Sequence, residues 1–132
     1  MTSVALAGAL IRVFEGCRLA SYKDSGGIWT IGFGHTAGVQ PGQLITYEQA
    51  LGFLQANLAP LLKLVGGVES PLAQAAYLSF GYNAGYGSLQ KVLAGKAALG
   101  DFVHDHTGNV LAGLQARRGL EAALIGWENP NA

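Results

Sequence analysis

The chain has 132 residues, half of them apolar and only 12% charged, and its formal net charge is zero. This length fits one domain with a sizeable core, and a neutral chain is a poor match for proteins that bind nucleic acid by neutralising phosphates. The single cysteine, Cys17, excludes an internal disulfide, and we interpret it as a small buried apolar residue.

The first predicted element is a helix over residues 1–15, capped by Thr2 or Ser3 and ended by Gly16. Residues 1–11 are apolar, but they are too few to span a bilayer and lack the basic start and cleavage pattern of a signal peptide. We therefore expect no signal peptide, no anchor and no stable membrane insertion. Glu15 falls in the last helical turn, where the helix dipole favours a protonated carboxyl group.

Two short strands follow, over residues 19–22 and 28–33, with a turn over 23–27 between them and a third short strand near 43–45. Asp24 lies in the turn, nine positions after Glu15, and Thr30 lies in the second strand, six positions later. A helix end, a turn and a strand thus each offer an oxygen atom. A glycosidase requires two carboxyl groups, one on each side of the scissile bond.

The rest of the chain is predicted to be helical. A capping box at residues 46–49 opens a helix to about 64, in which Pro60 suggests a break or kink near Ala59. Ser70 and Pro71 begin a buried helix, which leaves by an irregular segment over 82–87. Three more helices are predicted: one capped by Ser88 and running to Leu93, one over 96–104, and one over 110–127 with Leu111, Leu114, Leu120 and Leu124 facing inward.

The His104-Asp105-His106 sequence is the one place that invites a metal site. Alternating positions on a helix do not bring these side chains onto one ion, so we interpret the segment as a solvated loop. We predict that the protein uses no metal and no cofactor.

The segment from Glu15 to His35 resembles the active-site segment of the phage-type lysozymes, the endolysins related to those of T-even and lambdoid phages. The matching positions are Glu15, Asp24, Thr30, Gly32, Gly34 and His35. Residues 78–85 resemble the family's Ser-Phe-x-(Phe/Tyr)-Asn-x-Gly helix end, and residues 113–121 resemble its Gly-Leu-x-x-Arg-Arg-x-x-Glu segment. The resemblance extends from Ile11 to Trp127.

This resemblance implies an α+β, lysozyme-like fold. A small N-terminal β-hairpin lobe and a larger, all-helical C-terminal lobe would be joined by a long helix, with a cleft between them. The whole chain, residues 1–132, would form a single lysozyme-like domain. Residues from about 12 to 57 would make the active-site lobe, and residues from about 58 to 132 the helical lobe, on which the N-terminal helix packs.

The resemblance also implies a peptidoglycan hydrolase, a muramidase that cleaves the β-1,4 bond between N-acetylmuramic acid and N-acetylglucosamine. Glu15 would be the catalytic acid, while Asp24 stays ionised and, with Thr30, holds the attacking water. The family inverts the anomeric carbon, which predicts carboxyl groups roughly 6.5–9.5 Å apart.

Five further residues are assigned to substrate binding or to support of the site: Gly32, His35, Tyr82, Asn83 and Gln90. His35 is expected to support the site rather than to perform chemistry. Two interpretations of the arginine pair at 117 and 118 stay open. The arginines either meet acidic groups of the peptide stem, or form ion pairs with Glu121 or Asp101 that brace the helical lobe.

The expected partner is bacterial peptidoglycan, with no nucleic acid. By resemblance, a monomeric protein would build up in the host cytoplasm and reach the periplasm and cell wall with the help of a holin-type membrane permeabiliser. Three other functions are compatible with the sequence. They are a catalytically impaired peptidoglycan-binding or phage structural module, a lytic transglycosylase, which works with one glutamate and no aspartate partner, and a chitinase.

Overall fold

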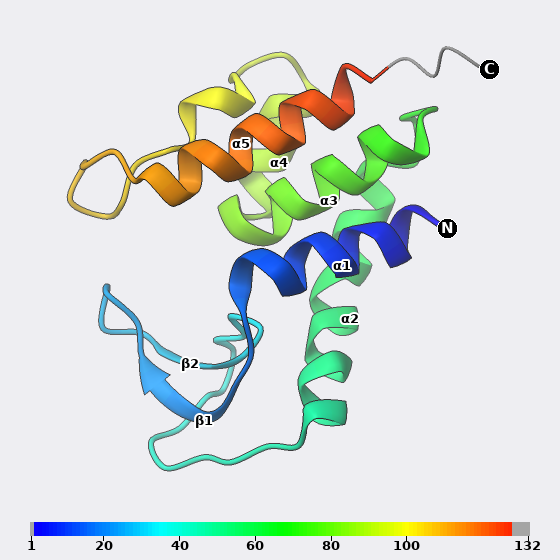
Figure 1. Ribbon diagram of the computed structural model, residues 1–132. Helices are drawn as coiled ribbons and strands as arrows, with labels where there is room; N and C mark the ends of the chain where they lie inside the picture. The colour runs from blue at the N-terminus through cyan, green and yellow to red at the C-terminus, as the bar shows by residue number, and fades with distance from the viewer. Residues whose placement is uncertain (1, 128–132) are drawn as a thin grey trace.

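A computed structural model describes residues 2–127 and has the predicted α+β architecture (Figure 1). A two-stranded hairpin forms the small lobe, and α2 runs from beside it into the group of helices that forms the large lobe. The elements in chain order are α1 (Ser3–Glu15), β1 (Arg18–Lys23), β2 (Trp29–Gly32), α2 (Tyr47–Leu64), α3 (Pro71–Ala84), α4 (Tyr86–Leu93), the 3-10 turn η1 (Leu99–Asp101) and α5 (Ala112–Ile125).

Local capping determines where the first helices begin, as the sequence predicts. The Thr2 hydroxyl accepts a hydrogen bond from the Ala5 amide, and the Ser70 hydroxyl accepts one from the Ala73 amide. Thr46 and Gln49 cap each other's backbone amides at the start of α2. Each contact satisfies an amide that a helix start otherwise leaves without a partner.

Helix α2 continues through Pro60 to Leu64, so of the break or kink predicted near Ala59 the break is wrong. Proline removes only one amide from the helical hydrogen-bond ladder. Leu58 and Leu61, on either side of Pro60, are 2% and 4% exposed. Burial of these two side chains in the core therefore holds both flanking turns in helical conformation.

The hairpin is antiparallel, with Tyr22 opposite Thr30 and Lys23 opposite Trp29. Because successive side chains alternate between the faces of a strand, Thr30 and Trp29 lie on opposite faces. The expected third strand is reduced to a single bridge between Ala20 and Leu44. Each edge of the hairpin therefore has one short contact: Ala20 with Leu44 beyond β1, and Ile31 with His35 beyond β2.

Helix α3 is the centre of the large lobe, with α1, α2, α4 and α5 packed around it (Figure 1). Small residues on α3 let its neighbours approach closely: a Cβ atom at Gly81 would come within 2.8 Å of Leu89 Cδ2. The buried apolar core consists of Ala7, Ile11, Phe33, Ala50, Leu54, Leu58, Leu61, Val65, Ala75, Leu78, Phe80, Leu89 and Leu99.

Three predictions about the C-terminal half are wrong. Helix α3 continues regularly to Ala84, and α4 begins directly after Gly85, so Ser88 caps no helix. Gly85 has φ 102°, a conformation that favours glycine and allows the chain to turn in one residue. The predicted helix over 96–104 is only the 3-10 turn at Leu99–Asp101.

The predicted inward face of the last helix is also wrong in part. Leu111 and Leu120 are 42% and 41% exposed, whereas the buried side chains of α5 are Arg117, Arg118 and Glu121. A charged face can be buried here because α1 and α3 supply partners for it. The spacing of the leucines alone does not indicate that those partners exist.

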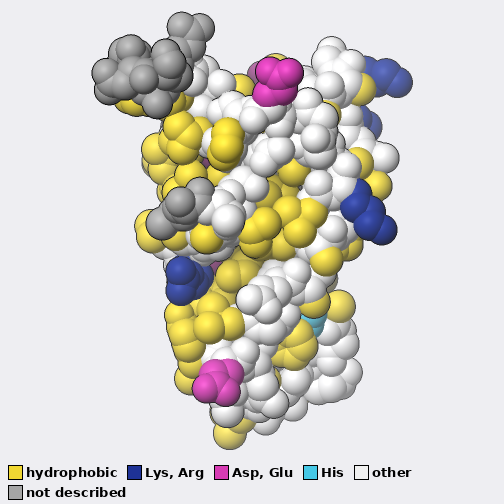
Figure 2. All heavy atoms as spheres, turned by 90° about the vertical axis from the view of Figure 1, so that its right-hand side faces the viewer, with side chains coloured by type: hydrophobic (Ala, Val, Ile, Leu, Met, Phe, Trp, Pro, Cys, Tyr) yellow, Lys and Arg dark blue, Asp and Glu magenta, His cyan; other side chains and the backbone are white. Residues whose placement is uncertain are grey.

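The surface is poor in charge, as the composition requires, and Figure 2 shows a face on which apolar and uncharged side chains predominate.

Cys17 is exposed, which contradicts the expectation of a buried apolar role. It follows Gly16, whose φ of 64° swings the chain away from α1 before β1 begins. Within residues 2–127, none of the helices combines the length and apolarity needed to cross a bilayer.

Candidate active site

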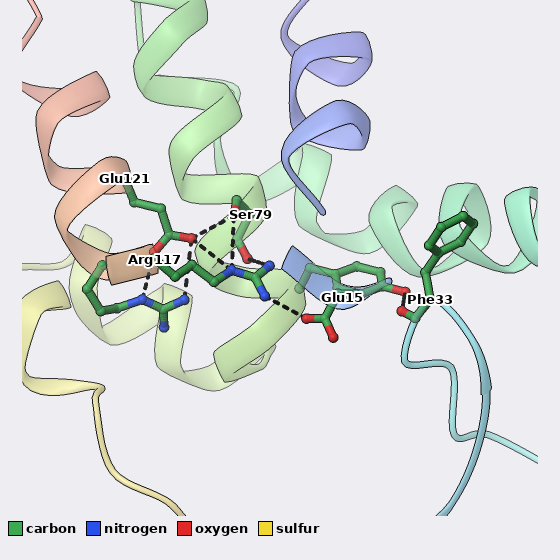
Figure 3. Close-up of polar contacts among 7 residues, drawn as sticks. Glu15, Phe33, Ser79, Arg117 and Glu121 are labelled. Atoms are coloured by element: carbon green, nitrogen blue, oxygen red, sulfur yellow. Dashed lines mark hydrogen bonds and ion pairs between the residues drawn. The ribbon is translucent and has the colours of Figure 1, made fainter. Parts of the chain in front are cut away.

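Glu15 ends α1, and its side chain is 21% exposed. Arg117 Nη1, from α5, lies 2.6 Å from Glu15 Oε1 (Figure 3). The other carboxylate oxygen, Oε2, makes no hydrogen bond within the described residues. One oxygen of Glu15 is thus fixed by a guanidinium, and the other remains free to meet a ligand.

Gly34 makes room for the free oxygen of Glu15. A Cβ atom at this position would lie 3.0 Å from Glu15 Oε2, and the backbone has φ 78°. Glycine therefore satisfies both a steric and a conformational requirement here. Gly34 also lines the cavity described below, so Glu15 Oε2 lies next to a residue of the cavity wall, although Glu15 is not part of the lining.

Asp24 and Thr30 are linked through Ile28 at the end of the hairpin. The Ile28 carbonyl accepts hydrogen bonds from the Asp24 amide and the Thr30 hydroxyl, each at 2.9 Å. Asp24 Oδ1 in turn accepts from the amides of Gly26 and Ile28, both at 2.9 Å. Asp24 is exposed, whereas Thr30 is 3% exposed. The turn thus fixes a carboxylate and a hydroxyl relative to one another.

A cavity of about 250 Å³ lies where the segment after β2 meets α2, α3 and the start of α4. His35 lies in its wall, with Nδ1 3.0 Å from Asn57 Nδ2 and its ring stacked on Phe53 at 4.0 Å between centroids. Asn57 and Phe53 therefore hold the His35 ring in the cavity wall. The full lining is Gly34, His35, Thr36, Ala37, Asn57, Pro60, Leu61, Gly81, Tyr82 and Tyr86.

Tyr82 connects this cavity wall to the hairpin side. Its hydroxyl donates a hydrogen bond to the Phe33 carbonyl (Figure 3). Burial raises the pKa of Tyr82 to about 12, and the nearby carboxylate of Glu15 contributes in the same direction. The phenol is therefore neutral at physiological pH and acts as a hydrogen-bond donor.

Behind Glu15 lies a buried ionic network (Figure 3). Ser79 Oγ donates to Glu121 Oε2 at 2.6 Å, and Arg117 Nη2 donates to the Ser79 carbonyl at 3.0 Å. Arg118 Nε lies 2.7 Å from Glu121 Oε1, close enough for an ion pair but without hydrogen-bond alignment. Burial raises the pKa of Glu121 and lowers that of Arg118. Both arginines thus brace the helical lobe, the second of the two interpretations left open by the sequence.

The other residues assigned to substrate binding lie elsewhere. Asn83 lines a separate hollow of about 340 Å³ beside Arg118, and Gln90 lines another of about 620 Å³. Gly32 faces Ala50, whose Cβ would lie 3.3 Å from a Cβ atom on the glycine, so its role is close packing. Of the five, the structure brings only Tyr82 and His35 to the cavity.

Sequence reasoning missed Asn57 and the role of Ser79, and it considered Glu121 only as a possible ion-pair partner of the arginines. Asn57 lies one helical turn after Phe53, so the two residues that hold His35 share a face of α2. Ser79 is a polar side chain in an otherwise apolar helix, and Glu121 follows Arg117 at the ion-pairing distance of four residues. These spacings are visible in the sequence, but the partners that connect the elements are not.

No group of three potential metal-ligating side chains occurs in the described range, residues 2–127. Asp105, at the centre of the His-Asp-His sequence, directs Oδ1 to the amides of Thr107 and Asn109 in its own loop.

Comparison with known proteins points to one family. The sequence model of the family described as "Phage lysozyme" matches residues 12–121. The endolysin of Acyrthosiphon pisum secondary endosymbiont phage 1 is 41% identical over 69 residues, which are 52% of this chain and 47% of that endolysin. The match thus spans about half the length of that relative.

Solved structures show the same fold over nearly the whole chain. The endolysin from Escherichia coli O157:H7 phage FAHEc1 superposes with a TM-score of 0.79 and 28% identity, covering 96% of this chain and 94% of that one. The muramidase domain of SpmX from Asticaccaulis excentricus gives a TM-score of 0.76 and 28% identity, covering 92% and 95%. The chain is thus similar to a phage endolysin and to a bacterial muramidase domain.

Proposed function

We propose that this chain, which belongs to the phage lysozyme family, is a lysozyme-type glycoside hydrolase acting on bacterial peptidoglycan. The bond cleaved is the β-1,4 bond between N-acetylmuramic acid and N-acetylglucosamine. The observation that carries the proposal is the place of Glu15: its free oxygen meets Gly34, at the edge of a cavity between the two lobes. The similarity to a muramidase domain supports the same bond.

Glu15 is the proposed general acid. Cleavage requires a proton on the oxygen of the leaving sugar, and a carboxyl group at the cavity edge is suited to deliver it. Arg117 holds one oxygen, so the proton is donated from Oε2, the oxygen next to Gly34. The neutral phenol of Tyr82, hydrogen-bonded to Phe33, helps to keep the cavity wall in place.

Asp24 and Thr30 are the proposed partners of the attacking water. Asp24 keeps its charge beside the developing positive charge on the sugar, and it accepts a proton from water on the opposite face of the ring. The Thr30 hydroxyl already donates to the Ile28 carbonyl, so its oxygen is left to accept a hydrogen bond from that water. This arrangement inverts the anomeric carbon and requires carboxyl groups roughly 6.5–9.5 Å apart.

The sugar chain is proposed to lie along the cavity between His35 and Tyr82, both of which line it. Tyr86, at the outer part of the same lining, is 46% exposed and offers an aromatic face to a sugar ring. Asn83 and Gln90, which face separate hollows, are proposed to contact only parts of the substrate outside this cavity.

The test is product analysis on purified Gram-negative peptidoglycan. Mass spectrometry of the digest is expected to find reducing N-acetylmuramic acid ends, and NMR of the fresh product is expected to find the α anomer first. Anhydro ends would indicate a lytic transglycosylase, and cleavage of chitin alone would indicate a chitinase. Binding without any new ends would indicate a peptidoglycan-binding module.

The proposed biological role is host lysis by a phage. A monomeric enzyme accumulates in the host cytoplasm and reaches the wall after a holin-type partner opens the membrane. Expression in Escherichia coli with and without a co-expressed holin tests this role: lysis is expected only with the holin. Lysis at the same rate without it would contradict the proposed dependence.

A further inference from the structure

A buried carboxylate, Glu121, lies behind the proposed catalytic acid and takes no part in the reaction proposed above. It is 0% exposed and does not line the cavity beside Glu15. A carboxylate in such a place is costly unless it is paired. Its partners are Ser79 and the two arginines of α5, one of which reaches Glu15.

Arg117 is held from both ends. Its Nη1 meets Glu15 Oε1 at 2.6 Å, while its Nη2 donates to the Ser79 carbonyl at 3.0 Å. On the side away from Glu15, Arg117 Nε lies 3.4 Å from Ser79 Oγ and 3.5 Å from Glu121 Oε2. Figure 3 shows these contacts, and those to Ser79 and Glu121 do not involve the Glu15 carboxyl group.

We infer that Glu121 is a positioning residue for the catalytic acid. Together with Ser79 it holds Arg117 in place and offsets the charge of the two arginines. Glu15 therefore gains and loses its proton opposite a fixed, partly neutralised guanidinium. This inference rests on the proposed function, because it needs Glu15 to act as the acid. Glu121 does not line the cavity and acts on Glu15 only through the two arginines of α5.

Charged and titratable groups near Glu15 come from several elements, beginning with Arg12 in the same last turn of α1. Arg117 and, behind it, Arg118 face Glu15 from α5, Tyr82 from α3, and Asp24 belongs to the hairpin. If Glu121 loses its charge, two guanidiniums act on Glu15 without compensation. Positive charge favours the carboxylate over the carboxyl group, so Glu15 will lose its proton at a lower pH.

The test compares pH–rate profiles of peptidoglycan hydrolysis for the wild type, Glu121→Gln and the double variant Arg118→Met/Glu121→Gln. Loss of the acid's proton sets the alkaline limb of the profile. In Glu121→Gln this limb is expected to move to lower pH by about one unit. The double variant removes one charge of each sign, and its limb is expected to return toward the wild-type position. Glu69→Gln, at an exposed acid outside the network, is expected to leave the limb in place.

A folded Glu121→Gln protein with an unchanged alkaline limb would overturn the inference, even if its rate were lower, because a purely structural brace leaves the limb where it is. If Glu121→Gln does not fold, Arg118→Met replaces it: this variant removes a positive charge from the network, so it must move the limb to higher pH. If the wild type produces no new ends, the proposed function is wrong. The inference is then judged by the midpoint of the Glu15 carboxyl-carbon titration, measured by NMR in the same proteins.

Discussion

Arg117 Nη1 lies 2.6 Å from Glu15 Oε1, although the two residues are 102 positions apart in the chain. The contact joins the end of the first helix to the face of the last one. It fixes one oxygen of the proposed catalytic acid and leaves the other at the cavity edge next to Gly34. The site is therefore completed only when both ends of the chain have packed on α3.

Gly34→Ala is expected to reduce hydrolysis more than it reduces stability. The new Cβ would stand 3.0 Å from Glu15 Oε2 and force the carboxyl group to move. Gly38→Ala is the matched control, because Gly38 has a similar φ, 70° against 78°, and no atom within 4 Å of the added carbon. Both variants should lose about 1–2 kcal/mol of unfolding free energy from backbone strain, measured by urea denaturation. Equal hydrolysis rates in the two variants would contradict this view of Gly34.

Asp24→Asn is expected to lower the hydrolysis rate by about 10²-fold or more without unfolding the hairpin. Asparagine keeps an oxygen that accepts from the Gly26 and Ile28 amides, so only the charge and the basicity are lost. Asp105→Asn is the control, since Asp105 also directs Oδ1 to amides of its own loop. Its rate should match the wild type within a factor of about two, and a drop equal to that of Asp24→Asn would argue against a special role for Asp24.

Two substitutions, Thr30→Ser and Thr30→Val, separate the contribution of the Thr30 hydroxyl to catalysis from that of its side-chain packing. The serine variant retains a hydroxyl that can donate to the Ile28 carbonyl, whereas the valine variant retains only the shape. Thr30 is 3% exposed, so valine leaves the Ile28 carbonyl short of one donor and should cost about 1 kcal/mol. We expect the serine variant to keep most of the hydrolysis rate and the valine variant to lose most of it. Higher activity in the valine variant would exclude the proposed water contact.

Tyr82 is expected to make folding stability fall at high pH. Its pKa is raised to about 12 in the folded protein, mainly by burial, whereas an unfolded chain titrates tyrosine near 10. The stabilising contribution is therefore complete below about pH 10 and is lost as the pH rises toward 12. Urea denaturation across this range should show a loss of about 2 kcal/mol in the wild type that Tyr82→Phe lacks. Tyr86→Phe, at an exposed position, should behave like the wild type.

The parts of the fold that depend on neighbouring residues could be predicted from the sequence. Thr2, Thr46 and Ser70 each cap a helix as expected, because a capping contact needs only the next three residues. The hairpin turn follows from the same kind of local hydrogen bonding around Asp24. The helix end, turn and strand that carry the motif starting at Glu15 could therefore be predicted from the sequence.

What could not be predicted depends on distant partners. Leu120 has the spacing of an inward residue, yet it is 41% exposed because α5 turns Arg117 and Glu121 inward instead. That choice depends on Ser79 and Glu15, which lie 42 positions before Glu121 and 102 before Arg117. Likewise, Asn57 becomes part of the site only because His35, 22 positions earlier, folds against α2.

The most direct test of the account is the rate at which Glu15→Gln releases reducing ends from purified peptidoglycan. Glutamine can still accept the hydrogen bond of Arg117 but has no proton to give, so the variant should fold normally. Its rate should fall by about 10²–10⁴-fold, while Glu48→Gln, at an exposed acid in the first turn of α2, should retain the wild-type rate. A Glu15→Gln protein that cleaves peptidoglycan at close to the wild-type rate would contradict the assignment of Glu15 as the acid.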